Sequence, residues 1–346
     1  MLSIISINEQ DKWDSIVKSF ENYDVFYLSS YAKAFQLTKA GIPLLLYYSD
    51  CSSRAINVIM KRDIATAACF NGKIPTNKFF DISSPYGYGG FLIEGDRQAG
   101  EIEKSYNVFC QSNGIISEFV RFQLFNNYQN HFQGTVESKM SNVVRTLDLP
   151  LDEIQREFEH KVRKNIKRAE NSKLNVICDS AGKYLDQFLE IYHNTMRRTG
   201  AAESFFFPLE FFDRINQMNG NYIYFHAMLD KQIISTELVL FGKENCYSFL
   251  GGTNQDFFHF RPNDYLKYHI ILWAKKMLLK RFILGGGYGE DDGIFKYKKS
   301  FAPNRIKPFF TGKKIFDQDA YNYLVSLRSS EASFKPESNY FPLYRS

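Results

Sequence analysis

The stretch NDYLKYHIILWAKKMLLKRFILGGGYGEDDGIFKYKKSFAPNRIKPFFTGKKIFDQDAYNYL, residues 263–324, decides the fold. Its apolar spacing predicts a helix over 263–280, then a buried strand, and a final helix near 317–328. The strand ends in three consecutive glycines: Gly285, Gly286 and Gly287. Glycines at a strand end let backbone amides approach a ligand closely, although a tight turn explains them equally well. The stretch therefore predicts an α/β domain with a candidate ligand site at the strand end.

The same mixture of helix and strand patterns extends back to the N-terminus. Helices are expected at 11–21, 29–40, 97–113, 151–173, 183–200 and 209–218; strands are expected at 44–49, 56–62, 79–84, 116–125, 135–149, 174–179, 222–229, 233–241 and 245–251. Pro150 precedes a strongly periodic helix, which marks a boundary. We predict an α/β protein of two tandem domains, 1–148 and 149–346, each a mixed central sheet flanked by helices.

Composition limits the kind of protein. The 346 residues are 44% hydrophobic, and 43 basic against 38 acidic residues give a net charge of +5. That mild excess of positive charge permits an anionic substrate, but it is far below the charge density of a dedicated nucleic-acid-binding protein. The five cysteines and six histidines are scattered without metal-ligand spacing, so no metal site or disulfide framework is expected.

The N-terminus does not read as a signal peptide, and no run reaches the roughly 18 apolar residues of a spanning helix. We expect a protein without an integral membrane segment. Its expected location is the cytoplasm, where it can act at the inner face of the membrane. The oligomeric state stays open.

Four short motifs carry a family resemblance: Trp273-Ala274, Leu284-Gly285-Gly286, Asp291-Asp292 and Tyr297-Lys298-Lys299-Ser300-Phe301. In this order they resemble the last domain of the FemABX ligases and of BioF-like acyltransferases, within the GNAT superfamily. SPYGYGG at 84–90 and VRKNIKRAENSKLNV at 162–176 support the resemblance, which is strong after residue 260 and loose before residue 80. It implies two tandem GNAT-like domains with a cleft between them, in which an amine attacks an activated acyl group directly.

The resemblance also implies roles for individual residues. Lys298 is expected to stabilise negative charge at the reacting centre. Asp291 and Asp292 are expected to hold the acceptor amine or to accept its proton, a polar loop tip being the alternative. The predicted substrate contacts are Gly285, Gly286, Gly287, Tyr288, Tyr297, Phe301 and Tyr86.

The donor is left open between acyl-CoA and aminoacyl-tRNA, with no bound cofactor. The segment before helix 263–280 has no glycine-rich turn, and Asp264 in the first helical turn repels a pyrophosphate. A basic helix presents Lys164, Lys167 and Arg168, which suit phosphate contacts to a donor such as tRNA. A solvated helix face is the alternative, and it is the interpretation that we favour.

Three departures from the Fem pattern concern the acceptor. Gln123 follows Arg121-Phe122 where those ligases have Asp, Phe35 replaces a basic residue, and Phe206-Phe207-Pro208 replaces Arg-Pro. We therefore expect acyl or aminoacyl transfer to the amino group of a cell-envelope glycan or amino-sugar precursor, nucleotide-linked or lipid-linked. The alternatives are a Fem-type ligase that extends a peptidoglycan peptide from aminoacyl-tRNA, and a non-catalytic binding module.

Overall fold

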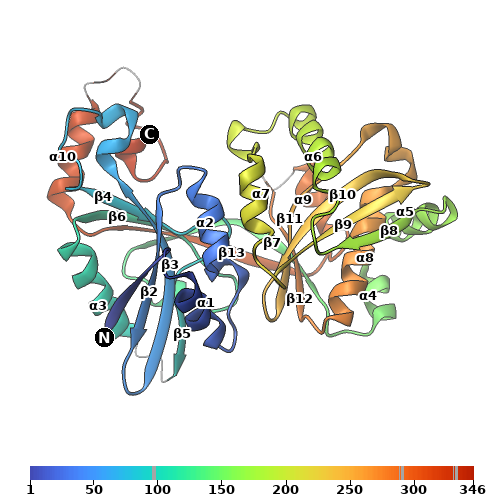
Figure 1. The fold of residues 1–346 in the computed structure, drawn as a ribbon, viewed down its shortest axis with the longest axis horizontal. Helices are drawn as coiled ribbons and strands as arrows, with labels where there is room; N and C mark the ends of the chain where they lie inside the picture. The colour runs from blue at the N-terminus through green and yellow to red at the C-terminus, as the bar shows by residue number, and fades with distance from the viewer. Residues whose placement is uncertain (96–98, 288, 290–291, 330, 332–333) are drawn as a thin grey trace. The chain divides into compact units, whose positions relative to one another are not determined.

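The computed structural model describes the chain except residues 96–98, 288, 290–291, 330 and 332–333. It divides into two compact units (Figure 1). Unit 1 comprises Met1–Lys139 together with Phe309–Ser346, and unit 2 comprises Met140–Pro308.

Unit 1 is a mixed sheet with helices packed on it. Its strands lie in the order β1-β2-β3-β4-β6-β13-β7, with β5 paired to β3. The β4–β6 pair is parallel, whereas the pairs β1–β2, β2–β3, β3–β4, β3–β5 and β6–β13 are antiparallel. The strands are β1 (Leu2–Ser6), β2 (Ile42–Ser49), β3 (Ser53–Asp63), β4 (Phe80–Ser83), β5 (Leu92–Gly95), β6 (Ile115–Arg121), β7 (Thr135–Thr146) and β13 (Ile306–Ile315). The helices are α1 (Gln10–Ser19), α2 (Ser29–Gln36), α3 (Ala99–Ser112) and α10 (Gln318–Ser329).

Helices cover both faces of the unit 1 sheet. Successive strand residues point to opposite faces, and Leu45 and Leu46 of β2 are both fully buried. Helices α1 and α2 contact β1, β2 and β3, α10 contacts β6, and α3 contacts both β1 and β6. Trp13 of α1 is completely buried and donates through its ring nitrogen to the Tyr27 carbonyl at 2.8 Å.

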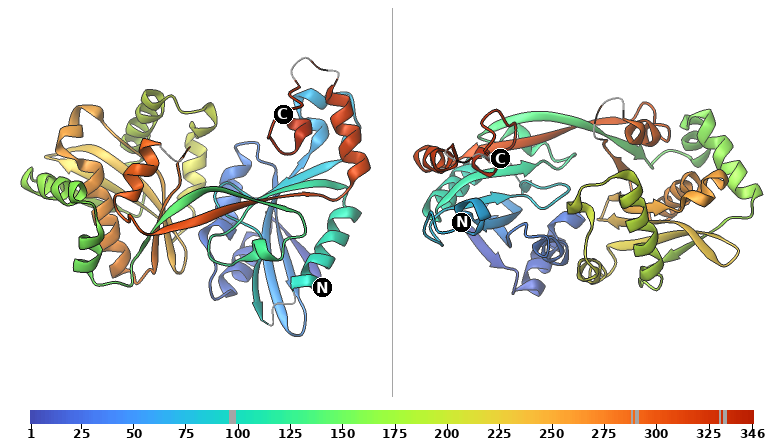
Figure 2. Two further views of the ribbon diagram at one scale, coloured as in Figure 1. Left: turned by 180° about the vertical axis from the view of Figure 1, so that it is seen from behind. Right: turned by 90° about the horizontal axis from the view of Figure 1, so that it is seen from above.

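The C-terminal segment belongs to unit 1, which corrects the predicted domain 149–346. Strands β7 and β13 are neighbours, and each passes from one unit into the other (Figure 2). Thr311–Ile315 then pair with β6, and Lys314 forms a buried ion pair with Glu103 of α3 at 2.9 Å. Arg345, at the chain end, binds Asp81 of β4 at 2.5 Å. These pairings, which are remote in sequence, bring the last 38 residues to the first unit.

Unit 2 has a second mixed sheet in the order β7-β12-β11-β10-β9-β8, in which β11 and β12 are parallel. Its further strands are β8 (Asn175–Asp179), β9 (Tyr222–Leu229), β10 (Gln232–Phe241), β11 (Asn245–Thr253) and β12 (Arg281–Gly285). Its helices are α4 (Leu151–Glu157), α5 (His160–Asn171), α6 (Leu185–Thr199), α7 (Leu209–Ile215), α8 (Pro262–Lys276) and α9 (Gly293–Lys299).

The single helix predicted over 151–173 is two helices. Phe158 is extended, with ψ near 143°, and separates α4 from α5. Its ring is buried and meets Phe301 edge-on at 5.6 Å between centroids. Burial of a large aromatic ring outweighs the gain from one more helical turn, so the helix breaks there.

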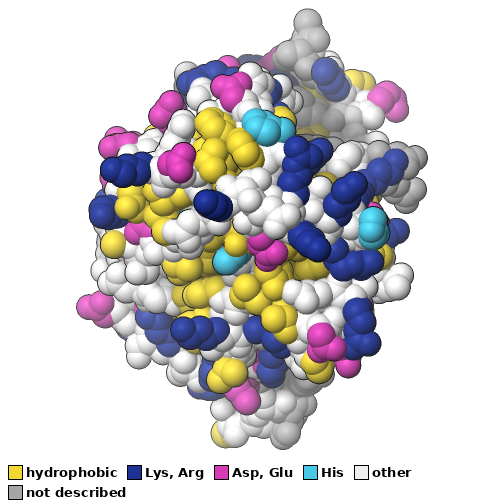
Figure 3. Space-filling view, turned by 90° about the vertical axis from the view of Figure 1, so that its right-hand side faces the viewer, with side chains coloured by type: hydrophobic (Ala, Val, Ile, Leu, Met, Phe, Trp, Pro, Cys, Tyr) yellow, Lys and Arg dark blue, Asp and Glu magenta, His cyan; other side chains and the backbone are white. Residues whose placement is uncertain are grey.

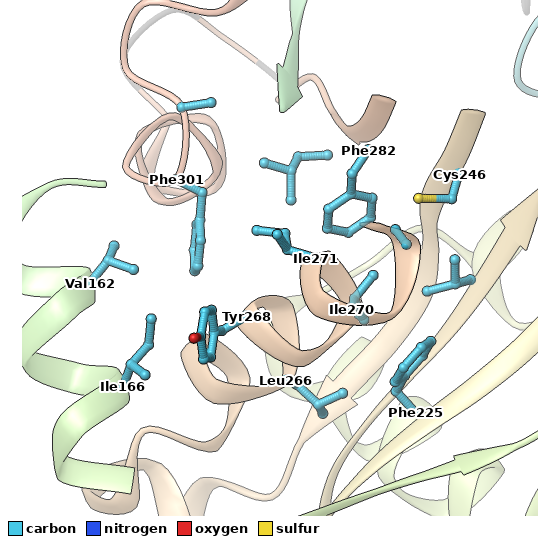
Figure 4. Packing of buried hydrophobic residues seen from close by; sticks show 14 of the residues in the cluster. Val162, Ile166, Phe225, Cys246, Leu266, Tyr268, Ile270, Ile271, Phe282 and Phe301 are labelled. Atoms are coloured by element: carbon cyan, nitrogen blue, oxygen red, sulfur yellow. The ribbon is translucent and has the colours of Figure 1, made fainter. Parts of the chain in front are cut away.

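The two faces of the unit 2 sheet carry different layers. Alternate residues of β9, such as Phe225, face an apolar cluster with α5 and α8, which Figure 4 shows with Phe301 pointing toward Tyr268 of α8. On the other face, Tyr224 packs against Phe188 of α6 at 5.0 Å between ring centroids. Trp273 and Ala274, the pair in the family motif, belong to the α8 core, where Trp273 meets Phe225 and Phe241 edge-on.

A buried arginine ties β7, α4 and the end of α9 together. The Arg145 side chain is completely buried, donates to the Phe301 carbonyl at 3.2 Å and pairs with Glu157. Glu157 also binds Arg305 at 2.8 Å. The Arg305 hydrogen bond, reinforced by Arg145, lowers the pKa of Glu157 to about 2.

We predict that Glu157→Gln destabilises the protein by about 2 kcal/mol, because it leaves Arg145 buried without a counter-charge. The value lies below that of a wholly buried pair because Glu157 is 34% exposed. Since its folded pKa is below the unfolded value of about 4.3, its stabilisation is complete above that pH and disappears as pH falls toward 2. Denaturant unfolding from pH 7 to pH 3 measures both effects.

Arg156→Gln is the matched control, because Arg156 pairs with Asp152 at the surface. This substitution should change the free energy of unfolding by less than about 0.5 kcal/mol. Equal losses in the two variants would contradict the structural role of Glu157.

Candidate active site

Lys298 on α9 lies against the glycine-rich end of β12. Its Nζ donates to the Gly286 carbonyl at 2.6 Å. Gly285 has φ of +85°, and a Cβ built there would stand 3.2 Å from the Lys298 Nζ. A side chain at residue 285 would therefore strain the backbone and crowd the lysine, which explains the glycine. The structure thus brings together two groups that the sequence singled out separately.

The Lys298 ammonium is held in a partly desolvated place. Burial is the main cause that lowers its pKa to about 8, and the positive charge of Lys267 adds to it, whereas Glu237 and Asp292 oppose it. The group is mostly protonated at neutral pH. Over the described chain, Gly286 is its one hydrogen-bond acceptor, so two of the three N–H donors of the ammonium remain for a ligand.

A buried ion pair supports the site from the α8 face of the sheet. Lys267 of α8 binds both carboxylate oxygens of Glu237 on β10 at 2.5 Å and the Ser248 hydroxyl of β11 at 2.7 Å. Sequence reasoning did not select these residues. Their signal is a charge inside an apolar run, as with Glu237 in IISTELVLF, residues 233–241.

The parallel strands β11 and β12 stop pairing next to Ser248, which binds Lys267. The paired residues of β11 and β12 run from Asn245 opposite Arg281 to Tyr247 opposite Ile283, although β11 continues to Thr253. Ser248 and Leu284 follow directly after the last pair, and Gly285 is the next residue of β12. The β11–β12 ladder therefore ends close to Gly285, the residue beside the Lys298 ammonium.

Asp292 acts as the N-cap of α9. Its Oδ1 accepts hydrogen bonds from the backbone N–H groups of Ile294 and Phe295, the latter at 3.0 Å. A Cβ at Gly287 would overlap the Asp292 carboxylate, so this glycine also serves the cap. The carboxylate thereby positions the helix that carries Lys298. The other residues predicted in this loop, Tyr288 and Asp291, lie outside the described residues.

Tyr297 and Phe301 hold α9 on the core. Phe301 is completely buried in the apolar cluster, and the Tyr297 ring meets it edge-on at 5.4 Å between centroids. Among the residues that the structure describes, none forms a hydrogen bond with the buried Tyr297 hydroxyl, and burial raises its pKa well above the ordinary value. Both residues were predicted as substrate contacts; their contacts here orient Lys298.

The predicted donor-binding residues form the outer side of α5. Val162, Ile166 and Ala169 face the core, whereas Lys164, Lys167 and Arg168 are exposed and, among the described residues, make no ion pair. Figure 3 looks onto the side on which α5 lies in Figure 1, and Lys and Arg side chains gather there. Asp264 is buried and accepts from Asn165 of α5 at 3.1 Å, which joins α5 to α8.

The positions that depart from the Fem pattern are packed within their own units. In unit 1, Gln123 donates to Asp24 at 3.3 Å, and Phe35 stacks on the exposed ring of Tyr86 at 5.8 Å. In unit 2, Phe207 stacks on Phe211 at 4.2 Å. Tyr86, the remaining predicted substrate contact, lies in the glycine-rich segment of unit 1.

Comparisons with known proteins concern the domain and the fold. Residues 156–299 match the family described as "Acetyltransferase (GNAT) domain". A search of the curated proteins gave no significant match. Among solved structures, FemX aligns at a TM-score of 0.69 and 15% identity, covering 93% of this chain and 99% of its own.

Two further structures carry lysylphosphatidylglycerol synthetase or L-PGS in their names. The C-terminal domain of a putative lysylphosphatidylglycerol synthetase from Agrobacterium fabrum aligns at a TM-score of 0.58 and 9% identity, covering 94% of this chain and 97% of its own. L-PGS from Bacillus licheniformis aligns at 0.55 and 12% identity, covering 92% and 96%. At these identities the likeness concerns the fold.

The protein is an acyltransferase, because residues 156–299 form a GNAT acetyltransferase domain. Over nearly the whole chain, the fold is similar to that of FemX.

We predict that Asp292→Ala lowers the free energy of unfolding by about 1 kcal/mol, whereas Asp292→Asn changes it by less than about 0.5 kcal/mol, because Asn caps a helix as Asp does. Transfer activity should follow stability and stay within about threefold of wild type in Asp292→Asn. Denaturant unfolding and initial rates measure the two quantities. A large loss of maximal rate in the stable Asn variant would make Asp292 a proton acceptor instead of a positioning residue.

Proposed function

We propose that the protein transfers an acyl or aminoacyl group to the amino group of a cell-envelope precursor, with an amino sugar or glycan as the acceptor. The observation that carries the proposal is the protonated Lys298, anchored by Gly286 and left with N–H donors that no described residue occupies. A fixed ammonium of this kind stabilises the oxyanion that forms when an amine attacks a carbonyl.

The reaction needs no covalent enzyme intermediate. The neutral amine attacks the acyl carbonyl carbon, and charge collects on the carbonyl oxygen, which Lys298 binds. This attack forms the C–N bond, and the C–S or C–O bond to the donor breaks when the carbonyl double bond re-forms. The proton of the amine leaves to solvent or to the departing donor group, so atoms and charges balance.

Two donors remain, acyl-CoA and aminoacyl-tRNA. GNAT domains generally use acyl-CoA, which favours the first. The exposed basic side of α5 and the likeness to FemX and to a putative lysylphosphatidylglycerol synthetase favour the second. In the described residues, no helix is long and apolar enough to cross a membrane. We propose a nucleotide-linked or lipid-linked sugar as the acceptor, handled in the cytoplasm or at the inner face of the membrane.

A Fem-type ligase acting on a peptidoglycan peptide is the second candidate. The fold favours it, whereas Gln123 and Phe35, both packed against neighbours in unit 1, differ from the Fem pattern. Lys298 argues against a non-catalytic module, because its pKa is lowered and no described residue binds its remaining N–H donors.

We predict that Lys298→Ala reduces the transfer rate by about 100- to 1000-fold without unfolding the protein, because one preorganised charge contact is lost. The assay uses labelled acetyl-CoA and, separately, charged tRNA as donors, with amino-sugar and peptidoglycan-peptide acceptors. Lys299→Ala, the next residue of α9, is the control and should keep nearly full activity. A folded Lys298→Ala variant with ordinary turnover would refute the role of Lys298.

The donor arms separate the alternatives. Transfer from acetyl-CoA identifies the acyltransferase. Transfer from charged tRNA, weakened by salt and by neutralising Lys164, Lys167 and Arg168, identifies the aminoacyl ligase, because phosphate contacts release counterions. Absence of transfer with every donor would overturn the proposal in favour of the binding module.

A further inference from the structure

Arg121 at the end of β6 is a charged side chain for which the described residues supply no counter-ion. It is partly buried, and desolvation lowers its pKa below the ordinary value. In the part of the chain that the structure describes, its guanidinium makes no ion pair and no side-chain hydrogen bond. The guanidinium packs on the Phe119 ring, whose centroid lies 4.9 Å from the guanidinium carbon.

The groups around Arg121 do not neutralise it. The side chains that act on its charge include the phenols of Tyr86, Tyr31 and Tyr340 and the guanidinium of Arg62, and none of these four groups is a carboxylate. Arg62 is itself paired with Asp81 at 2.7 Å, and Asp81 also binds Arg345. One carboxylate therefore already serves two other arginines.

The backbone around Arg121 is fixed before any ligand arrives. The Arg121 N–H donates to the Ser84 hydroxyl at 3.0 Å, and its carbonyl accepts from the Gly89 N–H at 2.6 Å. The Tyr31 hydroxyl donates to the Tyr86 carbonyl at 2.7 Å. These bonds pin the glycine-rich segment SPYGYGG, residues 84–90, to β6 and α2.

An aromatic surface adjoins the charge. Tyr86 is 44% exposed, and its ring is nearly parallel to that of Phe35, with 22° between the planes. Phe35 is buried and backs the Tyr86 ring from within unit 1. An exposed, supported ring offers a flat apolar surface for the C–H face of a sugar.

Leaving a partly buried guanidinium unpaired costs free energy. Arginine matches the planar, bidentate geometry of carboxylates and phosphates. We propose that Arg121 and Tyr86 form a binding site for a sugar that carries a phosphate ester or a carboxylate close to its ring. Arg121 binds the oxyanion, and the sugar ring stacks on Tyr86. Calling this sugar the acceptor rests on the proposed function; the binding itself does not.

Calorimetry with the full-length protein tests the site, with glucose 1-phosphate, glucuronate and glucose as probes. We expect one or both anionic sugars to bind and neutral glucose to bind at least about tenfold more weakly. Arg121→Gln should weaken anionic sugar binding about tenfold or more, and Tyr86→Ala should weaken it to a smaller degree. Preference for glucose 1-phosphate identifies a phosphate ester, and preference for glucuronate identifies a carboxylate.

Lys18→Gln removes an exposed charge from α1 of the same unit and is the control, with unchanged binding. Equal affinities in wild type and Arg121→Gln, or no binding of either anionic sugar, would overturn the proposal. Lys298→Ala should retain sugar binding, so failure of the transfer mechanism and failure of this site are distinguishable.

Thermal unfolding gives a readout that a purely structural arginine would not give. Replacing an unpaired buried charge by Met should leave the melting temperature unchanged or raise it, and should abolish stabilisation by the anionic sugar. A marked loss of stability in Arg121→Met, together with undiminished sugar binding in Arg121→Gln, would make Arg121 a structural residue.

Discussion

A protonated lysine held against the Gly286 carbonyl is the constraint on which the unit 2 site depends. An ammonium stabilises a developing negative charge best when it is held rigidly in position. Helix α9, which carries Lys298, is fixed at both ends. Asp292 caps its start, and Arg145 binds the Phe301 carbonyl just beyond its end. Glu157 in turn holds Arg145, so a charge pair outside the site decides how precisely the lysine is placed.

Buried charges in this protein fall into two kinds. Lys267 with Glu237, and Lys314 with Glu103, are fully buried pairs that join a helix or strand to its neighbour. Lys298 in unit 2 and Arg121 in unit 1 form no ion pair with a carboxylate of the described chain. Each has N–H donors that no described residue binds. The first kind stabilises the fold, and at the second kind we propose that bound ligands supply the missing negative charge.

The sequence predicted most of the elements and the neighbourhood of Lys298, but not the domain boundary. Strand 222–229 and helix 183–200 were predicted well because their apolar spacing is strong and uninterrupted. Strand β13 was missed because lysines interrupt its apolar pattern, and α9 was missed because seven residues with three lysines show no period. The boundary failed for the same reason, since β13 returns the chain to unit 1. The Lys267–Glu237 pair depends on packing of α8 on β10, which local sequence does not contain.

The proposed role of Lys298 depends on the pKa of its ammonium group. Its pKa can be measured directly by following the side-chain Cε resonance against pH in isotope-labelled protein, with the signal assigned by its disappearance in Lys298→Arg. The structure predicts a pKa of about 8, lowered by burial and by Lys267. A value near 10.4, that of an ordinary solvated lysine, would show that the ammonium is not desolvated and would contradict the site described here.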